Sequence, residues 1–257
     1  MSQRPLILLS NDDGVHAKGL RLLRDALLQI ADVVTVAPLF EQSANSHALT
    51  LARPLRHRII DELHAIDGTP ADCVYVALFE ARFLPRKPDL VVSGINHGYN
   101  LATDTFYSGT VAAAREGALR GVPAIAFSCG SGGSMEAAMP ICARIASRML
   151  SAPKPAGAAA LLNVNFPAGR ASYQGVRATC LGRRRYIDEV HLRNDPRGHE
   201  YFWIGGPSAE HDPMPGSDTD AVDAGYVSVT PLLLDHSQPE HLGLAAYVAA
   251  EGGPADP

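Results

Sequence analysis

Short apolar runs that alternate with helix-like segments constrain this chain more than any other feature of its sequence. The runs that read as strands lie at residues 6–10, 33–37, 89–93, 122–128 and 161–166. Between them, apolar spacing and helix-start residues predict helices near 20–28, 69–83, 109–119 and 135–150. Strands that alternate with helices in this way form a parallel sheet covered on both faces. The sequence therefore predicts a doubly wound α/β fold with a mostly parallel sheet.

The pattern changes beyond the last of these strands. Residues 175–181 and 226–230 read as strands, and between them Asp195–Gly198 reads as the turn of a long hairpin. The hairpin carries Tyr201–Trp203 but has little core of its own, so we expect its aromatic edge to pack against another subunit. Residues 239–251 predict a short amphipathic tail helix.

Composition and charge exclude several classes of protein. Apolar residues make up 46% of the 257 residues, which is too many for a disordered chain. The net charge of −5 argues against a general nucleic-acid binder. No apolar run reaches the roughly 18 residues of a membrane span, and the run 6–9 is too short for a signal-peptide core. The cysteines are scattered without a Cys-x-x-Cys pair, so we expect buried free thiols in a cytoplasmic protein. From the charge and the short apolar runs we expect neither a membrane nor a stable nucleic-acid partner.

The strongest local signal is Ser10–Val15, with the sequence Ser-Asn-Asp-Asp-Gly-Val, directly after the first predicted strand. Ligands bind beyond the carboxyl ends of the strands in doubly wound sheets, so Asp12 and Asp13 lie where a site is expected. Adjacent carboxylates repel each other, and holding both ionised requires a cation or strong hydrogen bonds. Mg²⁺ and Mn²⁺ prefer such oxygen ligands. Taken alone, this segment is explained equally well as a simple turn.

Other strand-end loops also carry oxygen donors. Ser43 follows the second predicted strand and Asn96 the third, although Ser43 taken singly is better explained by a solvated loop. Ser108, Gly109 and Thr110 open a predicted helix, and helix N-termini attract anions. Ser108 alone reads as an ordinary N-cap. Combined with a cation site on neighbouring strand ends, these residues predict a phosphate site.

Two polar features are interpreted as structural. His47 reads as a surface or packing histidine, and the basic run Arg183–Arg185 as a solvated or inter-subunit face. The chain contains no G-x-S-x-G elbow, no Walker P-loop and no G-x-G-x-x-G after a strand. Serine-hydrolase and dinucleotide-binding chemistry are therefore not indicated.

Taken together, these segments resemble the SurE family, the stationary-phase survival proteins that are metal-dependent nucleotide phosphatases. The matching motifs lie in order at 8–15, 37–38 with 42–43, 68–74, 92–100, 107–117, 163–167, 183–185 and 225–231. The resemblance implies a Rossmann-like sheet with a protruding β-hairpin and a C-terminal helix. It divides the chain into a catalytic core, 1–170, and a C-terminal part, 171–257, with the oligomerisation arm, a strand that returns to the core and the tail helix.

The resemblance also implies a function, a 5′-nucleotidase that hydrolyses nucleoside monophosphates. One Mg²⁺ or Mn²⁺ per subunit would be held by four oxygen donors, which are Asp12, Asp13, Ser43 and Asn96. The phosphate would be bound by Asn96, Ser108, Gly109 and Thr110. The catalytic residues would be Asp12, Asp13 and Asn96. The protein would assemble as a homodimer or homotetramer. A phosphatase of other small phosphoesters or short polyphosphate, and a metal-dependent nucleotide sensor without hydrolysis, remain alternatives.

One departure from the family pattern bears on specificity. After Ala37-Pro38 the family usually has an acidic residue followed by a basic one, whereas this chain has Leu39-Phe40. The predicted metal ligand Ser43 is retained, so the departure concerns nucleotide preference and leaves the catalytic residues in place.

Overall fold

The structure is a computed structural model that describes residues 3–153, 157, 159–170, 172–186, 190–205 and 209–250. Its centre is a nine-stranded sheet with the order β3-β4-β2-β1-β5-β6-β7-β13-β8. In that order the strands span His57–Ile60, Leu63–Ile66, Asp32–Pro38, Leu6–Ser10, Leu90–His97, Ala124–Cys129, Leu161–Phe166, Val227–Leu232 and Val176–Ala178. The strands from β4 to β7 run parallel, whereas β3 and β13 are antiparallel to β4 and β7. The predicted mostly parallel sheet is confirmed.

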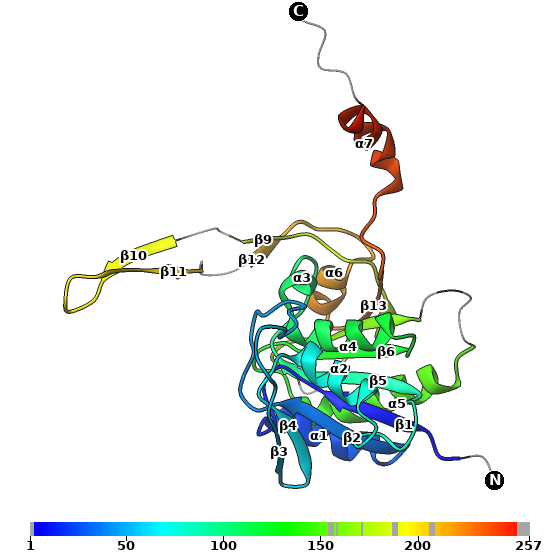
Figure 1. Cartoon of the computed structure of the whole chain (residues 1–257). Coiled ribbons are helices and arrows are strands. Elements are labelled where there is room, and N and C mark those ends of the chain that lie inside the picture. The colour runs from blue at the N-terminus through cyan, green and yellow to red at the C-terminus, as the bar shows by residue number, and fades with distance from the viewer. Residues whose placement is uncertain are drawn as a thin grey trace, which may run out of the picture.

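Helices cover both faces of this sheet (Figure 1). Helices α1 and α5 lie on one face, and α2 and α4 on the other. The α-helices of the described residues are α1 (Lys18–Leu27), α2 (Pro70–Phe79), α3 (Asp104–Tyr107), α4 (Gly109–Leu119), α5 (Met135–Ser151), α6 (Asp218–Asp223) and α7 (Leu242–Ala249). One apolar core lies under α1 and α5 and contains Ile7 and Leu9 of β1. The other lies under α2 and α4 and contains Leu6 and Leu8. Successive residues of β1 thus enter opposite cores, as expected of a strand buried on both faces.

The helix starts follow the sequence signals. The hydroxyl of Thr69 accepts a hydrogen bond from the backbone N–H of Asp72 (3.1 Å), and Asp72 Oδ2 accepts one from the N–H of Thr69 (2.9 Å), a reciprocal capping box. Ser108 Oγ caps α4 by accepting a backbone N–H of its first turn at 3.0 Å. Helix α4 begins and ends at the predicted residues. Helix α2 ends at Phe79, earlier than the predicted Phe83.

Two strand features differ from the sequence predictions. The hairpin β3–β4 was not predicted, because its turn residues Asp61 and Glu62 adopt φ angles of 47° and 68° without a glycine to signal the turn. Strand β5 continues to His97 and does not end at Ser93 as predicted. Its pairing with β6 shifts register between Ser93 and Asn96, so the last residues of β5 form an irregular extension of the strand.

A hairpin arm projects away from the sheet (Figure 1). Strands β10 (Val190–Asn194) and β11 (Glu200–Ile204) pair antiparallel, and the backbone N–H of Gly198 donates to the carbonyl of Asp195 at 2.9 Å in the predicted turn. Strands β9 (Arg184–Tyr186) and β12 (Ala209–His211) pair with each other between the arm and the sheet. Every residue of β10 and β11 is exposed. The predicted hairpin is confirmed, and the chain provides it with no covering layer among the described residues.

After the arm, β13 enters the sheet beside β7, and the chain then leaves toward α7 through a 3₁₀ turn at Pro239–His241. The predicted tail helix exists, but α7 reads Leu-Gly-Leu-Ala-Ala-Tyr-Val-Ala, is fully exposed and has no polar face. The prediction of an amphipathic helix was therefore wrong for 242–249, and Glu251 lies outside the described residues. Among the described residues, none of the helices is both long enough and apolar enough to cross a membrane.

The four cysteines are free thiols. Cys73, Cys129 and Cys142 are buried as predicted, whereas Cys180 is exposed, which corrects the expectation for that residue. Cys180 lies between β8 and β9, where the chain leaves the sheet toward the arm.

Candidate active site

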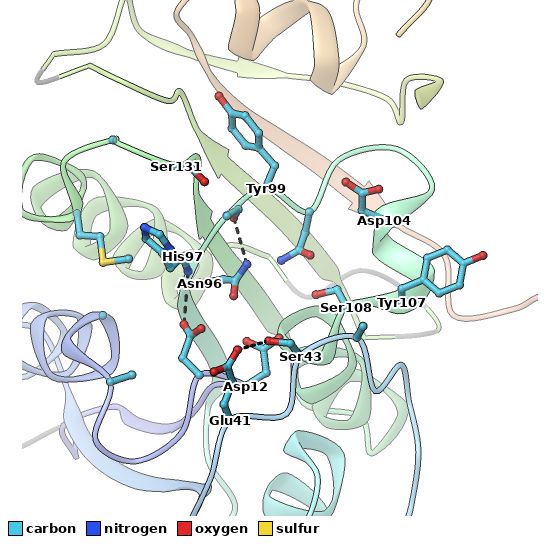
Figure 2. Close-up of a pocket in the computed structure, with 18 of the residues that line it drawn as sticks. Asp12, Glu41, Ser43, Asn96, His97, Tyr99, Asp104, Tyr107, Ser108 and Ser131 are labelled. Atoms are coloured by element: carbon cyan, nitrogen blue, oxygen red, sulfur yellow. Dashed lines mark hydrogen bonds between the residues drawn. The ribbon is translucent and has the colours of Figure 1, made fainter. Parts of the chain in front are cut away.

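The carboxyl ends of β1, β2 and β5 meet at one edge of the sheet, and a cleft of about 930 Å³ opens there. The four predicted metal ligands Asp12, Asp13, Ser43 and Asn96 all line this cleft, and so does the predicted phosphate ligand Ser108. Figure 2 shows Asp12, Ser43, Asn96 and Ser108 around the same opening. The loops that carry them are far apart in the sequence, so the parallel pairing of the strands brings them together.

Asp12 lies against the N-terminus of α4 and is only 5% exposed. The hydroxyl of Thr110 donates a hydrogen bond to Asp12 Oδ1. Gly109 leaves room for the same side chain, because an added Cβ would lie 2.9 Å from Asp12 Cβ. Burial raises the pKa of Asp12 to about 6. The hydrogen bond from Thr110 lowers the pKa in part, and the negative charge of Asp13 raises it further. The fold therefore holds a poorly solvated carboxylate that a positive charge would stabilise.

Asp13 is the less buried member of the pair. Its Oδ2 accepts a hydrogen bond from the backbone N–H of His97 at 3.4 Å. Burial raises the pKa of the Asp13 carboxyl above its ordinary value, the His97 N–H lowers it in part, and the nearby charge of Glu41 raises it again. Negative charge thus accumulates at this end of the cleft.

Glu41 is a cleft residue that the sequence reasoning missed. It lines the cleft, and its Oε1 accepts a hydrogen bond from Ser43 Oγ at 2.6 Å (Figure 2). Its place two residues before Ser43 in a strand-end loop is the signal that marks it. Glu41 orients the Ser43 hydroxyl and adds a carboxylate beside Asp13.

A buried polar network holds the segment that follows Asn96 at the end of β5. The amide of Asn96 donates to the carbonyl of Gly98 at 3.1 Å. Beneath it, the backbone carbonyl of Asn100 accepts hydrogen bonds from Asn163 (2.7 Å) and Asn165 (3.1 Å), and the side-chain amide of Asn100 donates to Ser128 Oγ at 2.7 Å. These bonds connect Asn100 to β6 and β7, so they fix the position of the segment that follows β5.

The opposite wall of the cleft comes from α3 and from the strand at the base of the arm. Asp104 of α3 and Arg184 of β9 both line the cleft and form an ion pair. This placement corrects the interpretation of the basic run, because Arg184 belongs to the cleft. Its neighbour Arg185 is exposed and forms an ion pair with Asp212 at 2.8 Å, so Arg185 fits the predicted solvated face.

The predicted phosphate cradle is divided between the cleft and its wall. Ser108 lines the cleft, whereas Gly109 and Thr110 pack behind Asp12. The N-terminus of α4 thus faces a carboxylate of the protein itself on one side and the cleft on the other.

The donor set of the cleft is made of oxygen atoms. Across the described ranges, no group of three or more His, Cys, Asp and Glu side chains is arranged to hold a metal. The two adjacent aspartates are accompanied by the neutral oxygens of Ser43 and Asn96. Such a set suits a hard divalent cation better than zinc, which prefers nitrogen and sulfur ligands.

Comparison with known proteins agrees with this geometry. A family model described as "Survival protein SurE" matches residues 7–188. The chain is 58% identical over 252 residues to the 5′-nucleotidase SurE of Sorangium cellulosum, covering 96% of this chain and 97% of the relative. It is 49% identical over 236 residues to the 5′-nucleotidase SurE of Anaeromyxobacter sp., covering 90% and 91%. The crystal structure of the SurE protein from Aquifex aeolicus superposes with a TM-score of 0.82 at 39% identity, covering 96% of this chain and 100% of that one.

Proposed function

The chain belongs to the SurE family, and from that premise we propose that it is a metal-dependent 5′-nucleotidase, hydrolysing nucleoside monophosphates to nucleoside and phosphate. The observation that carries the proposal is the convergence of Asp12, Asp13, Ser43 and Asn96 on one cleft beside the N-terminus of α4. The names of the relatives from Sorangium cellulosum and Anaeromyxobacter sp. support the same activity.

The residues present fit a divalent ion. Burial raises the pKa of Asp12 and of Asp13, so keeping both carboxylates ionised side by side is unfavourable. A bound cation would offset this repulsion and the loss of solvation. We assign one Mg²⁺ or Mn²⁺ per subunit to Asp12, Asp13, Ser43 and Asn96. When bound, such an ion polarises a phosphoryl oxygen and acidifies a water molecule.

Side chains and backbone groups of the cleft bind the phosphate and accept the proton of the attacking water. Ser108 and Asn96 donate hydrogen bonds to phosphoryl oxygens, and the backbone N–H groups at Gly109 and Thr110 add the positive end of the α4 dipole. The Thr110 hydroxyl orients Asp12 Oδ1. Asp12 or Asp13 accepts the proton of the attacking water on a carboxylate oxygen.

Phosphate release tests the proposal. A panel of 5′- and 3′-nucleoside monophosphates, a simple aryl phosphate and short polyphosphate is assayed with Mg²⁺, Mn²⁺ and chelator. The proposal expects the fastest release from 5′-nucleotides and none in chelator. Preference for the other phosphoesters would reassign the substrate, and nucleotide binding without release would indicate a sensor. The panel also gives the base preference of the protein, the property that the Leu39-Phe40 departure concerns.

We infer a homodimer or homotetramer built through the C-terminal part. Leu192, Phe202 and Trp203 of the arm are exposed, and large exposed apolar patches usually mark interfaces. Light scattering tests the assembly, and a monomer at micromolar concentration would contradict it.

The thiols bear on the compartment of the protein. Three buried free thiols, Cys73, Cys129 and Cys142, fit a reducing cytoplasm.

A further inference from the structure

We propose that Glu116 of α4 is a positioning residue that holds the loop 39–50, and with it Ser43, in place through a hydrogen-bonded bridge to His47. Neither His47 nor Glu116 lines the cleft, so the bridge acts through the loop backbone. The inference rests on the proposed metal site, because its consequence is the affinity of that site for a cation.

The bridge uses both oxygens of the carboxylate. Nε2 of His47 lies 2.8 Å from Glu116 Oε2, and Nε of Arg120 lies 2.7 Å from Glu116 Oε1. The side chain of Glu116 is 2% exposed. Burial would raise the pKa of Glu116, but the hydrogen bonds from His47 and Arg120 outweigh it, and the pKa lies below its ordinary value. The buried group is therefore a carboxylate that accepts from both partners.

The loop needs external bonds because its backbone is strained. Ala44 and Ser46 adopt φ angles of 57° and 52°, in the left-handed region that residues with a Cβ seldom occupy. Ser46 is tied at its N–H to the carbonyl of Tyr107 (2.9 Å) and at its hydroxyl to the carbonyl of Phe106 (2.6 Å). The next residue is His47, so the bridge to Glu116 is a side-chain anchor that directly follows the strained stretch.

Helix α4 connects this anchor to the other metal-ligand loop. At its N-terminus, Thr110 donates to Asp12 of the β1 loop. Farther along the same helix, Glu116 holds His47 of the β2 loop. The two loops also touch directly, since the N–H of Gln42 donates to the carbonyl of Asp12 at 2.8 Å. One rigid helix thus sets the spacing between Asp12 and the loop that carries Ser43.

The test compares three variants by calorimetric titration with Mn²⁺ alone and by thermal unfolding. His47→Leu removes the donor to Glu116, whereas His47→Gln keeps an amide nitrogen at a similar reach. The matched control is His211→Leu, since His211 Nε2 lies 2.7 Å from Asp223 Oδ2 and neither residue lines the cleft. We expect Mn²⁺ affinity to fall about tenfold in His47→Leu, as for other residues that orient metal ligands. Affinity should be largely retained in His47→Gln and unchanged in His211→Leu.

Several outcomes overturn the inference. Equal Mn²⁺ affinity in His47→Leu and the parent overturns it alone, and so does a similar loss in His211→Leu, which would indicate general destabilisation. Absence of Mn²⁺ binding in the parent overturns the proposed metal site and the inference together. If His47→Leu does not fold, Glu116→Gln takes its place, since it keeps the shape of the side chain and removes its charge, and the same tenfold loss is expected.

Discussion

The cleft and the hairpin arm are built by opposite means. In the cleft, polar side chains such as Asp12, Asn100 and Ser108 are buried and hydrogen-bonded within the subunit. In the arm, apolar side chains such as Phe202 and Trp203 are exposed, Trp203 at 65%. Buried polar groups need partners and large apolar groups need cover. The polar side chains of the cleft have partners within the subunit, whereas no described residue of the subunit covers the apolar side chains of the arm.

The two regions meet at Arg184. It belongs to β9 at the base of the arm and forms an ion pair with Asp104 across the wall of the cleft. A change in the arm can therefore reach the cleft through that wall, while the loops that carry Asp12 and Ser43 are held by α4. We therefore expect the two regions to differ in how well each tolerates a small change.

The largest effect is expected in the cleft. Asp12→Asn and Asp13→Asn each remove one negative charge with little change of shape, and each should lower kcat/KM about 100-fold, or ~2.7 kcal/mol, if the ion supplies several kcal/mol at the transition state. Ser43→Ala removes a neutral donor and should cost less. Steady-state phosphate release measures all three. Asp25→Asn on the exposed side of α1 is the control, and an Asp12→Asn enzyme with parental turnover would refute the assigned ligands.

The next effect is expected in the arm. Trp203→Ser should weaken subunit association by about 2 kcal/mol or more, since buried aromatic residues dominate the stability of interfaces. Sedimentation over a range of concentrations would detect the shift toward smaller species. Phe40→Ser is the matched control, because Phe40 is similarly exposed, at 67%, but lies on a loop of the core. If the two variants weakened association equally, or if neither did, the arm would not be the specific surface through which the subunits associate.

The third effect separates a phosphate ligand from an ordinary helix cap. Ser108→Ala and Ser134→Ala each remove an N-cap that accepts a backbone N–H, at 3.0 and 3.1 Å. Both should lower stability by about 1 kcal/mol. Only Ser108 lines the cleft, so only Ser108→Ala should also weaken inhibition by inorganic phosphate. Equal inhibition in both variants would leave Ser108 as a cap. Gly109 is a poor probe, because a side chain there would press on Asp12.

Local signals in the sequence are sufficient for much of the core. The apolar run of β1, the cap and length of α4, and the run of β7 predict the bounds that these elements have. The rule that ligands bind at strand ends predicts one shared region for Asp12, Asp13, Ser43 and Asn96, and all four line the cleft. Their roles as metal ligands remain a proposal.

The missed features depend on contacts between distant segments or on unusual backbone angles. Arg184 reaches the cleft through its ion pair with Asp104 of α3, about 80 positions earlier in the chain, and the run of arginines gives no sign of that pairing. The Asn163 and Asn165 side chains meet the carbonyl of Asn100 across more than sixty positions of sequence. The β3–β4 turn uses Asp61 and Glu62 at positive φ, where sequence patterns look for glycine or asparagine. No local pattern records such pairings.

The smallest effect is expected at two contacts of one type, a histidine beside a carboxylate. Glu116 is buried and His47 is half-buried near the cleft, whereas Asp195 and His199 lie at the exposed tip of the arm, 3.3 Å apart. The pKa of Glu116 is lowered from an ordinary value of 4.5, so its contribution to stability is complete above about pH 4.5 and is lost as the pH falls below that value. Thermal unfolding of Glu116→Gln should therefore differ from the parent by a constant amount at neutral pH, and the difference should shrink in acid. Asp195→Asn should alter the melting temperature little at any pH, because solvent screens the exposed pair. A Glu116→Gln difference that stays constant down to about pH 3 would show that the charge of this carboxylate does not stabilise the fold, and a large effect of Asp195→Asn would show that the arm tip is buried in the assembly.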